Sequence, residues 1–180
     1  MIVRRATAAD AEAMARCHAA SADVAYAHIA ERDPGLTERR LRAWSEILTG
    51  EHRAYLAEED GNVVGVLNVS DDELHVIYVH PDWWGTGVGQ QLLDQAHALL
   101  AATCDEAVLT VLADNPRARR FYERNGWVLA EELVEQHFGG LDVPICRYRK
   151  RLRDSAGRTS PGIEPGSARS AEPGSCPSRH

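Results

Sequence analysis

The chain has 180 residues, of which 44% are hydrophobic and 26% charged, as expected for one globular domain with its own core. Its formal net charge of −7 argues against a general nucleic-acid or anionic-membrane binder. No apolar stretch approaches the roughly 18 residues of a membrane span, and residues 1–14 lack the apolar core of a signal peptide, so we expect a cytoplasmic protein. The scattered cysteines and histidines predict reduced thiols and no metal site.

The N-terminal residues predict a strand followed by a capped helix. Residues 2–6 are expected to form a short strand. Thr7 and Asp10 have the offset of a capping box, in which a hydroxyl and a carboxyl satisfy free N–H groups at a helix start. We expect this helix to run through about Ala20.

A second helix and a hairpin are expected next. The helix runs from about Thr37 to Gly50, because glycine favours the position after a helix end. Residues 54–70 form two apolar runs around Asp60-Gly61, which is a strong signal for a β-hairpin. The apolar face of the helix comprises Leu41, Trp44 and Leu48.

The middle of the chain predicts a strand, a glycine-rich loop and a helix. Residues 73–79 form an apolar strand that ends at His80-Pro81. Residues 83–96, WWGTGVGQQLLDQA, then place glycines at three alternate positions, Gly85, Gly87 and Gly89. The helix that follows carries an apolar stripe of Val88, Leu92, Leu93, Ala96 and Leu100.

The last third predicts a strand, a short helix and a second hairpin. Residues 107–112 form an apolar strand of the kind that is covered on both faces of a sheet. Asn115 and Pro116 suit the N-cap and the first position of a helix that ends at Asn125-Gly126. The hairpin has strands near residues 133–138 and 143–148, which flank Gly139-Gly140.

This order of elements predicts a mixed α/β domain over residues 1–153, antiparallel at first and β-α-β in the middle. Residues 154–180 are rich in Gly, Pro and Ser and contain no aromatic residue. A segment of that composition cannot bury enough apolar surface to offset its ordering entropy, so we expect a disordered C-terminal tail.

The three glycines lie where a strand passes into a helix, and they admit two interpretations. A tight turn requires one glycine, whereas a cradle of free N–H groups for a phosphate would use all three. No Gly-Lys-Ser/Thr ending of a Walker loop is present. A dinucleotide fold needs G-x-G-x-x-G, and here the third glycine comes one residue early, although Asp114 after the next strand keeps that alternative open.

Two segments resemble the GNAT-type N-acetyltransferases. Residues 80–93, HPDWWGTGVGQQLL, are similar to the acetyl-CoA loop of that family, whose core is Arg/Gln-x-x-Gly-x-Gly/Ala; Trp84 replaces the Arg or Gln. Residues 115–127, NPRARRFYERNGW, resemble its second cofactor segment. The resemblance covers residues 2–150 and implies a central, mostly antiparallel sheet of about six or seven strands, flanked by helices, with a parallel β-loop-α-β unit at the cofactor site.

The resemblance also implies transfer of an acetyl group from acetyl-CoA to a primary amine, without a metal. It implies that the backbone of Ile77, Tyr78 and Val79 receives the pantetheine arm. Tyr122 would contact the cofactor and act as general acid toward sulfur, and Glu73, with His75 as second choice, would act as general base. The remaining cofactor contacts implied are Gly85, Thr86, Gly87, Val88, Gly89 and Gln90, whose N–H groups would hold the pyrophosphate, and Asn115.

Each side-chain role has a competing structural interpretation: packing for Tyr122, a plain helix cap for Asn115 and a solvated strand residue for Glu73. The acceptor is expected to be an amine of a small molecule or protein, with no nucleic-acid or membrane partner, and the protein a monomer or homodimer. Two other functions stay open, a catalytically silent CoA-binding module and a dinucleotide-dependent oxidoreductase. Residues expected to line the acceptor cleft are Tyr26, Glu31, Asp33 and Trp44.

Overall fold

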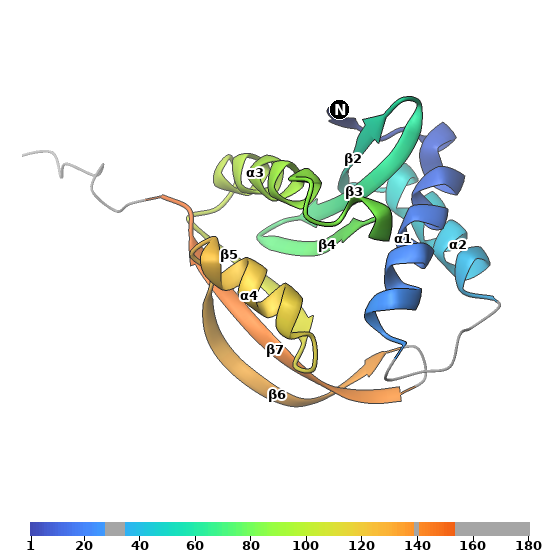
Figure 1. Ribbon diagram of the computed structural model, residues 1–180. Coiled ribbons are helices and arrows are strands. Elements are labelled where there is room, and N and C mark those ends of the chain that lie inside the picture. Colours follow the sequence, from blue (N-terminus) through green and yellow to red (C-terminus); the bar gives the residue numbers. More distant parts are fainter. Residues whose placement is uncertain (28–34, 139–140, 154–180) are drawn as a thin grey trace, which may run out of the picture.

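The computed structural model describes residues 1–27, 35–138 and 141–153, which form one sheet flanked by helices (Figure 1). Within this part of the chain the sheet has seven strands in the order β1-β2-β3-β4-β5-β7-β6. Every neighbouring pair is antiparallel except β4 and β5, which are parallel. The strands are β1 (Ile2–Arg5), β2 (Arg53–Glu59), β3 (Asn62–Ser70), β4 (Glu73–Val79), β5 (Glu106–Leu112), β6 (Val128–Phe138) and β7 (Leu141–Arg151).

Helices cover both faces of the first half of the sheet. Helices α1 (Ala11–Ala25) and α2 (Leu36–Thr49) pack on one face, and α3 (Val88–Ala101) packs on the other (Figure 1). Helix α4 (Pro116–Arg124) lies against the second half, where Tyr148 of β7 donates a hydrogen bond to Glu123 and accepts one from Arg119. The fold class predicted from the sequence is confirmed.

The start of α1 follows the predicted capping box. The carboxylate of Asp10 accepts hydrogen bonds from the N–H and the hydroxyl of Thr7, both at 2.8 Å, and it pairs with Arg4 of β1. The bond from Arg4, with smaller contributions from the Thr7 N–H and hydroxyl, holds the pKa of Asp10 below its usual range. The helix continues to Ala25, beyond the expected end at Ala20, and Ser21 and Ala22 in this added turn are buried and extend its packed face.

The expectation that Trp44 lines a substrate cleft is wrong. Its side chain is 1% exposed and packs in the core with Met14, Ala15 and Leu56. Trp44 lies on the same face of α2 as Leu41 and Leu48. Packing this apolar face against α1 and the sheet removes the large indole ring from water, which is more favourable than leaving it exposed in a cleft.

Helix α3 lies close to β3 because Gly65 has no side chain. A Cβ atom on Gly65 would be 2.7 Å from Leu92 Cδ1 and 2.9 Å from Val88 Cγ1. Both of these α3 side chains are fully buried, as are the other members of the predicted stripe, Leu93, Ala96 and Leu100. The contact at Gly65 therefore sets the distance between the sheet and the helix that follows the glycine loop.

We expect Gly65→Ala to lower the free energy of unfolding by about 1–3 kcal/mol, because an added methyl group in a packed core forces its neighbours to move. Denaturant unfolding measures the change. Gly89→Ala is the matched control, since a Cβ there would meet its nearest neighbours at the ordinary distances of 3.7 and 3.8 Å. Equal stability of the Gly65→Ala and wild-type proteins would contradict this account of how α3 is placed.

Strand β5 differs from its predicted environment. The sequence suggests cover on both faces, but Val108, Thr110 and Val111 remain partly exposed, while Ala107 and Leu109 are buried. Strand β5 lies in the interior of the sheet, so the exposure does not come from an edge. Thr110 and Val111 line a cleft beside β4, which accounts for their exposure.

The final hairpin is longer than the sequence suggested, since β6 and β7 each have 11 residues. The Asp60-Gly61 hairpin is confirmed, with positive φ at both turn residues. The predicted tail 154–180, the Gly139-Gly140 turn, and Glu31 and Asp33 lie outside the described residues. No helix in the described ranges is both long and apolar enough to cross a membrane.

Candidate active site

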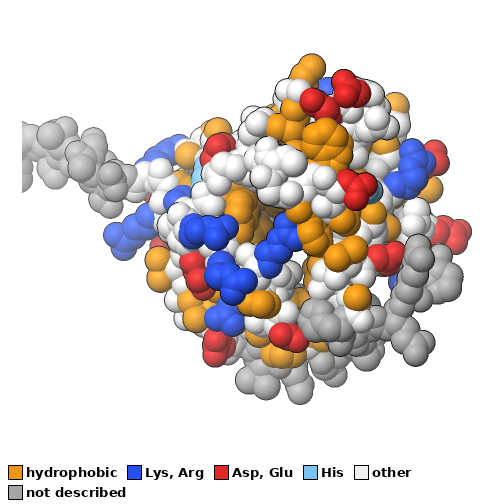
Figure 2. Space-filling view, in the orientation of Figure 1, with side chains coloured by type: hydrophobic (Ala, Val, Ile, Leu, Met, Phe, Trp, Pro, Cys, Tyr) orange, Lys and Arg blue, Asp and Glu red, His pale blue; other side chains and the backbone are white. Residues whose placement is uncertain are grey.

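A cleft opens where β4 and β5 separate. Within the described residues these parallel strands pair only at their beginnings, Glu73 with Val108 and Leu74 with Leu109. Beyond these pairs, β4 residues 77–79 and β5 residues 110–112 line opposite walls of a cleft of about 1000 Å³. Figure 2 shows the hollow, with hydrophobic side chains on its walls and Lys or Arg side chains beside it. Beyond Leu74 the β4 backbone that faces this gap has no partner on β5, and apart from the Val79 carbonyl, which accepts from Trp84, it offers hydrogen-bonding groups to a ligand.

The glycine loop forms the end of the cleft beside α3. Gly85 and Gly87 have φ values of 82° and 94°, which favour glycine, and a Cβ atom at either position would meet no protein atom within 4 Å. Gly87 is the N-cap of α3, and the N–H of Gln91 donates to its carbonyl at 3.1 Å. The N–H groups of residues 88–90 precede that bond and have no acceptor within the helix. Free N–H groups, open space and the positive end of α3 suit a phosphate group.

The predicted loop residues do not all line the cleft. Gly85, Gly87, Gly89 and Gln90 do, but Thr86 and Val88 do not. The hydroxyl of Thr86 donates to the carbonyl of Trp83 at 2.7 Å, and the side chain of Val88 is buried in the core. Thr86 and Val88 can therefore offer a ligand only their backbone.

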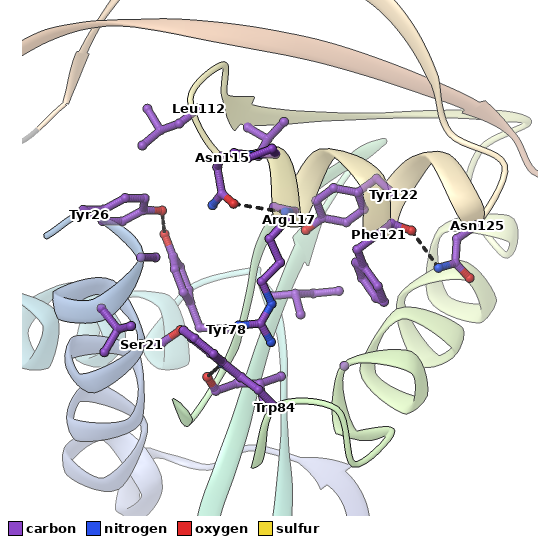
Figure 3. Close-up of a pocket in the computed structure, with 18 of the residues that line it drawn as sticks. Ser21, Tyr26, Tyr78, Trp84, Leu112, Asn115, Arg117, Phe121, Tyr122 and Asn125 are labelled. Atoms are coloured by element: carbon purple, nitrogen blue, oxygen red, sulfur yellow. Dashed lines mark hydrogen bonds between the residues drawn. The ribbon is translucent and has the colours of Figure 1, made fainter. Parts of the chain in front are cut away.

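Tyr122 enters the cleft from α4 (Figure 3). Its side chain is 9% exposed, and its ring packs edge-on against Phe121 and Trp127. Its hydroxyl has no hydrogen-bond partner among the described residues. Burial, with a smaller contribution from Tyr78, raises the pKa of Tyr122. The phenol therefore keeps its proton at neutral pH, as a general acid must.

Asn115 caps α4 and also lines the cleft. Its side-chain carbonyl accepts a hydrogen bond from the N–H of Ala118 at 3.0 Å, which confirms the predicted N-cap. The amide NH₂ group is left for a ligand. Asn115 can thus fulfil both interpretations that its sequence position allowed.

Glu73 and His75 lie together where β4 and β5 are still joined, at the closed end of the cleft. Their side chains approach to 3.6 Å, and His75 is hydrogen-bonded to Ser70 at 2.6 Å. Alternation along β4 places both side chains on the same face, and the strand has a bulge at His75, since Leu74 pairs with Val69 and Val76 with Asn68. About a third of each side chain is exposed, so water can reach both.

An aromatic cluster at the end of α1 forms another wall. The hydroxyl groups of Tyr26 and Tyr78 are hydrogen-bonded at 2.5 Å, and the ring of His18 stacks on Tyr78 with 4.0 Å between centroids. His18 is buried, neither of its ring nitrogens has a partner among the described residues, and burial lowers its pKa well below the usual value. Tyr26 lines the cleft as expected. His18 was not predicted from the sequence; it does not line the cleft itself and contacts it through Tyr78.

The sequence also gave no signal for Arg117 as a site residue. Its guanidinium lies 3.6 Å from the ring centroid of Trp84, and both residues line the cleft. The indole N–H of Trp84 donates to the carbonyl of Val79 at 2.8 Å. Among the described residues no group of His, Cys, Asp and Glu side chains could hold a metal ion.

Comparisons with known proteins agree with this geometry. Residues 50–129 match the family model described as acetyltransferase (GNAT) domain. A GCN5-related N-acetyltransferase from Rhodopseudomonas palustris is similar in structure, with a TM-score of 0.70 and 23% identity over 83% of this chain and 94% of that chain. No curated protein sequence matches the chain.

Two further solved structures with the same fold contain the cofactor. PaiA N-acetyltransferase from Thermoplasma acidophilum, in complex with coenzyme A, has a TM-score of 0.63 and 19% identity over 83% of this chain and 98% of that chain. YncA from Salmonella typhimurium, with acetyl-CoA, has a TM-score of 0.67 and 19% identity over 88% of this chain and 97% of that chain.

The match of residues 50–129 to the GNAT acetyltransferase domain model, and the fold shared with the solved acetyltransferases, agree with the resemblance found in the two motifs. The single parallel pair in the described sheet also differs from the doubly wound parallel sheet of a dinucleotide fold. The cleft residues fit a CoA thioester, because the gap between β4 and β5 offers backbone groups and the glycine loop offers N–H donors beside open space.

Proposed function

We propose that the protein is an acetyl-CoA-dependent N-acetyltransferase that acetylates a primary amine of a small molecule or protein. One observation carries the proposal. The separation of β4 from β5 leads directly into the glycine loop, and Tyr122 and Glu73 line the same cleft. A site of this kind has a place for an extended arm, a place for phosphate, and an acid and a base in the same cleft.

The reaction sets three demands on the site. An alkylammonium acceptor with a pKa of ~10.4 must lose a proton before its nitrogen can attack. As the C–N bond forms and the C–S bond breaks, negative charge passes from the carbonyl oxygen to sulfur, and both need stabilisation. Acetyl-CoA, when bound, supplies the acetyl carbon and the sulfur leaving group.

Residues of the chain meet these demands as follows. Glu73 accepts the ammonium proton, directly or through water, which the exposure of its side chain allows. A backbone N–H of residues 77–79 on β4 polarises the carbonyl. The Tyr122 hydroxyl, whose pKa is raised by burial, gives its proton to the departing sulfur.

Turnover over a panel of amines, followed by release of free thiol from acetyl-CoA, tests the proposal. The panel should contain polyamines, amino acids, aminoglycosides and peptides with a lysine or a free N-terminus. We expect amine-dependent thiol release with at least one class. Binding of CoA without turnover on any amine would favour the catalytically silent module, and binding of NAD in preference to CoA would favour the oxidoreductase.

The assignment of Glu73 has its own test. We expect Glu73→Gln to lower kcat at neutral pH by about 10²-fold or more, the usual effect of losing an acid–base group. Because the base removes the ammonium proton, the deficit should shrink as the pH rises toward the pKa of the amine. A pH profile of kcat for the wild type and the variant measures this.

His75→Gln is the control for Glu73, since the two side chains are in contact. It should lower kcat less than Glu73→Gln does. A wild-type rate for Glu73→Gln at neutral pH, with a large loss in His75→Gln, would transfer the role of base to His75.

A further inference from the structure

Trp84 and Arg117 join the two walls of the cleft beside the glycine loop (Figure 3). Trp84 follows β4, and its indole N–H is held by the carbonyl of Val79 at 2.8 Å. Arg117 is in the first turn of α4 on the opposite wall. Its guanidinium stacks on the indole ring 3.6 Å from the centroid, a geometry in which the ring attracts the cation.

The guanidinium of Arg117 forms no ion pair within the described part of the chain, whereas its neighbour on α4, Arg119, pairs with Glu132. Arg117 is exposed at the cleft, and the partial loss of water around its guanidinium lowers its pKa, although the group stays charged. The cleft therefore holds a cation that an aromatic ring positions and that no carboxylate of the described residues neutralises.

The neighbourhood of this cation suits an anion. Gly85 is next to Trp84 in the chain, and Gly85 and Gly87 both line the cleft with open space where a Cβ would be. The N–H groups at the start of α3 lie in the same loop. A guanidinium can donate two parallel hydrogen bonds to a phosphate, which single backbone N–H groups cannot do.

We propose that Arg117, held in place on the ring of Trp84, binds the pyrophosphate of acetyl-CoA together with the glycine loop. This role rests on the proposed function and adds a side-chain contact that the motifs did not indicate. Trp84 acts as a positioning residue: it supplies no charge, and its ring, fixed by the bond to Val79, orders the guanidinium before the ligand arrives.

Calorimetric binding of CoA to Arg117→Met tests the proposal. We expect the Kd to rise about 10- to 100-fold, as for loss of hydrogen bonds to a charged group. Dephospho-CoA keeps the pyrophosphate and lacks the 3′-phosphate. Its Kd should rise by the same factor from the wild type to Arg117→Met. Arg120→Met is the matched control, because it removes an equal charge from the same helix at an exposed position outside the cleft.

Trp84→Leu separates the positioning role from the charge. It should weaken CoA binding about 2- to 5-fold, in line with one cation–π contact. In the double variant with Arg117→Met, Trp84→Leu should raise the Kd for CoA little further, because the guanidinium that Trp84 positions is already absent. Additive losses in the double variant would overturn the positioning role of Trp84.

Each remaining outcome decides a separate question. Wild-type affinity for CoA in Arg117→Met would overturn the inference and leave the proposed function intact. If Arg117→Met binds CoA more weakly than the wild type does but binds dephospho-CoA equally well, Arg117 lies at the 3′-phosphate and the pyrophosphate assignment is overturned. Failure of the wild-type protein to bind CoA at all would overturn the proposed function and the inference with it.

Discussion

Replacement of Gly87 by valine is expected to abolish CoA binding while leaving the protein folded. Gly87 has φ of 94°, a conformation that costs a β-branched residue about 1–3 kcal/mol. The valine methyl groups would also enter the open space beside the loop, where a phosphate must approach the N–H groups at the start of α3. Either relaxation of the loop or occupation of that space removes the proposed phosphate site.

Thermal unfolding with and without CoA measures this effect. A ligand at about 100 times its Kd stabilises the wild-type fold by about 2.7 kcal/mol, and Gly87→Val should lose that increment. Gly61→Val is the matched control, because Gly61 has φ of 77° in the β2–β3 turn and does not line the cleft. It should lose stability and still respond to CoA. A folded Gly87→Val protein with the full CoA response would remove the glycine loop from the binding site.

Removal of the Tyr122 hydroxyl is expected to lower kcat by about 10²- to 10³-fold. This is the lower half of the range for a lost general acid, because a thiolate is already a fair leaving group. The loss should appear equally in kcat and kcat/KM, as for an interaction made only in the transition state. CoA affinity should stay within a few-fold, since the ring keeps its contacts with Phe121 and Trp127.

Stability separates this catalytic role from a packing role. The Tyr122 hydroxyl has no hydrogen-bond partner among the described residues, so Tyr122→Phe breaks no internal bond and should not lower the free energy of unfolding. Single-turnover kinetics of acetyl transfer, beside denaturant unfolding, measure both quantities. A wild-type single-turnover rate in Tyr122→Phe would make Tyr122 a packing residue only.

Much of the fold could be predicted because local signals and the fold agree. The capping box of Thr7 and Asp10, the turn at Asp60-Gly61 and the Asn115 cap are all decided within a few residues, and the structure has each of them. The end of α1 could not be predicted in this way. It depends on whether Ser21 and Ala22 are buried by the rest of the fold, which is a tertiary effect.

Trp44 illustrates how a residue type can mislead about a site. A tryptophan on an amphipathic helix can line a cleft or fill a core, and its spacing with Leu41 and Leu48 fits both. Because α2 packs on α1 and β2, the Trp44 side chain lies in the core and not in the cleft. Glycine positions were better guides, because the positive φ of Gly85 and Gly87 is a backbone requirement that few other residues meet.

The remaining features of the site arise between segments that are distant in the sequence. Separation of β4 from β5 depends on where two strands stop pairing, and the bulge at His75 depends on the register with β3. The contact of Arg117 with Trp84 joins a helix and a loop that are 33 residues apart. Neither residue type at its position indicates that contact, so only the structure could reveal it.

The central claim is that the cleft between β4 and β5 transfers an acetyl group from acetyl-CoA to an amine. In the most direct measurement, the wild-type protein is incubated with the amine panel and with acetyl-CoA that carries carbon-13 in its acetyl group. Mass spectrometry then gives the masses of the amines. We expect one amine class to gain one labelled acetyl group for each free CoA formed, and Gly87→Val to form none. Formation of free CoA with no labelled amine, or of labelled amine at equal rates with Gly87→Val, would contradict the account.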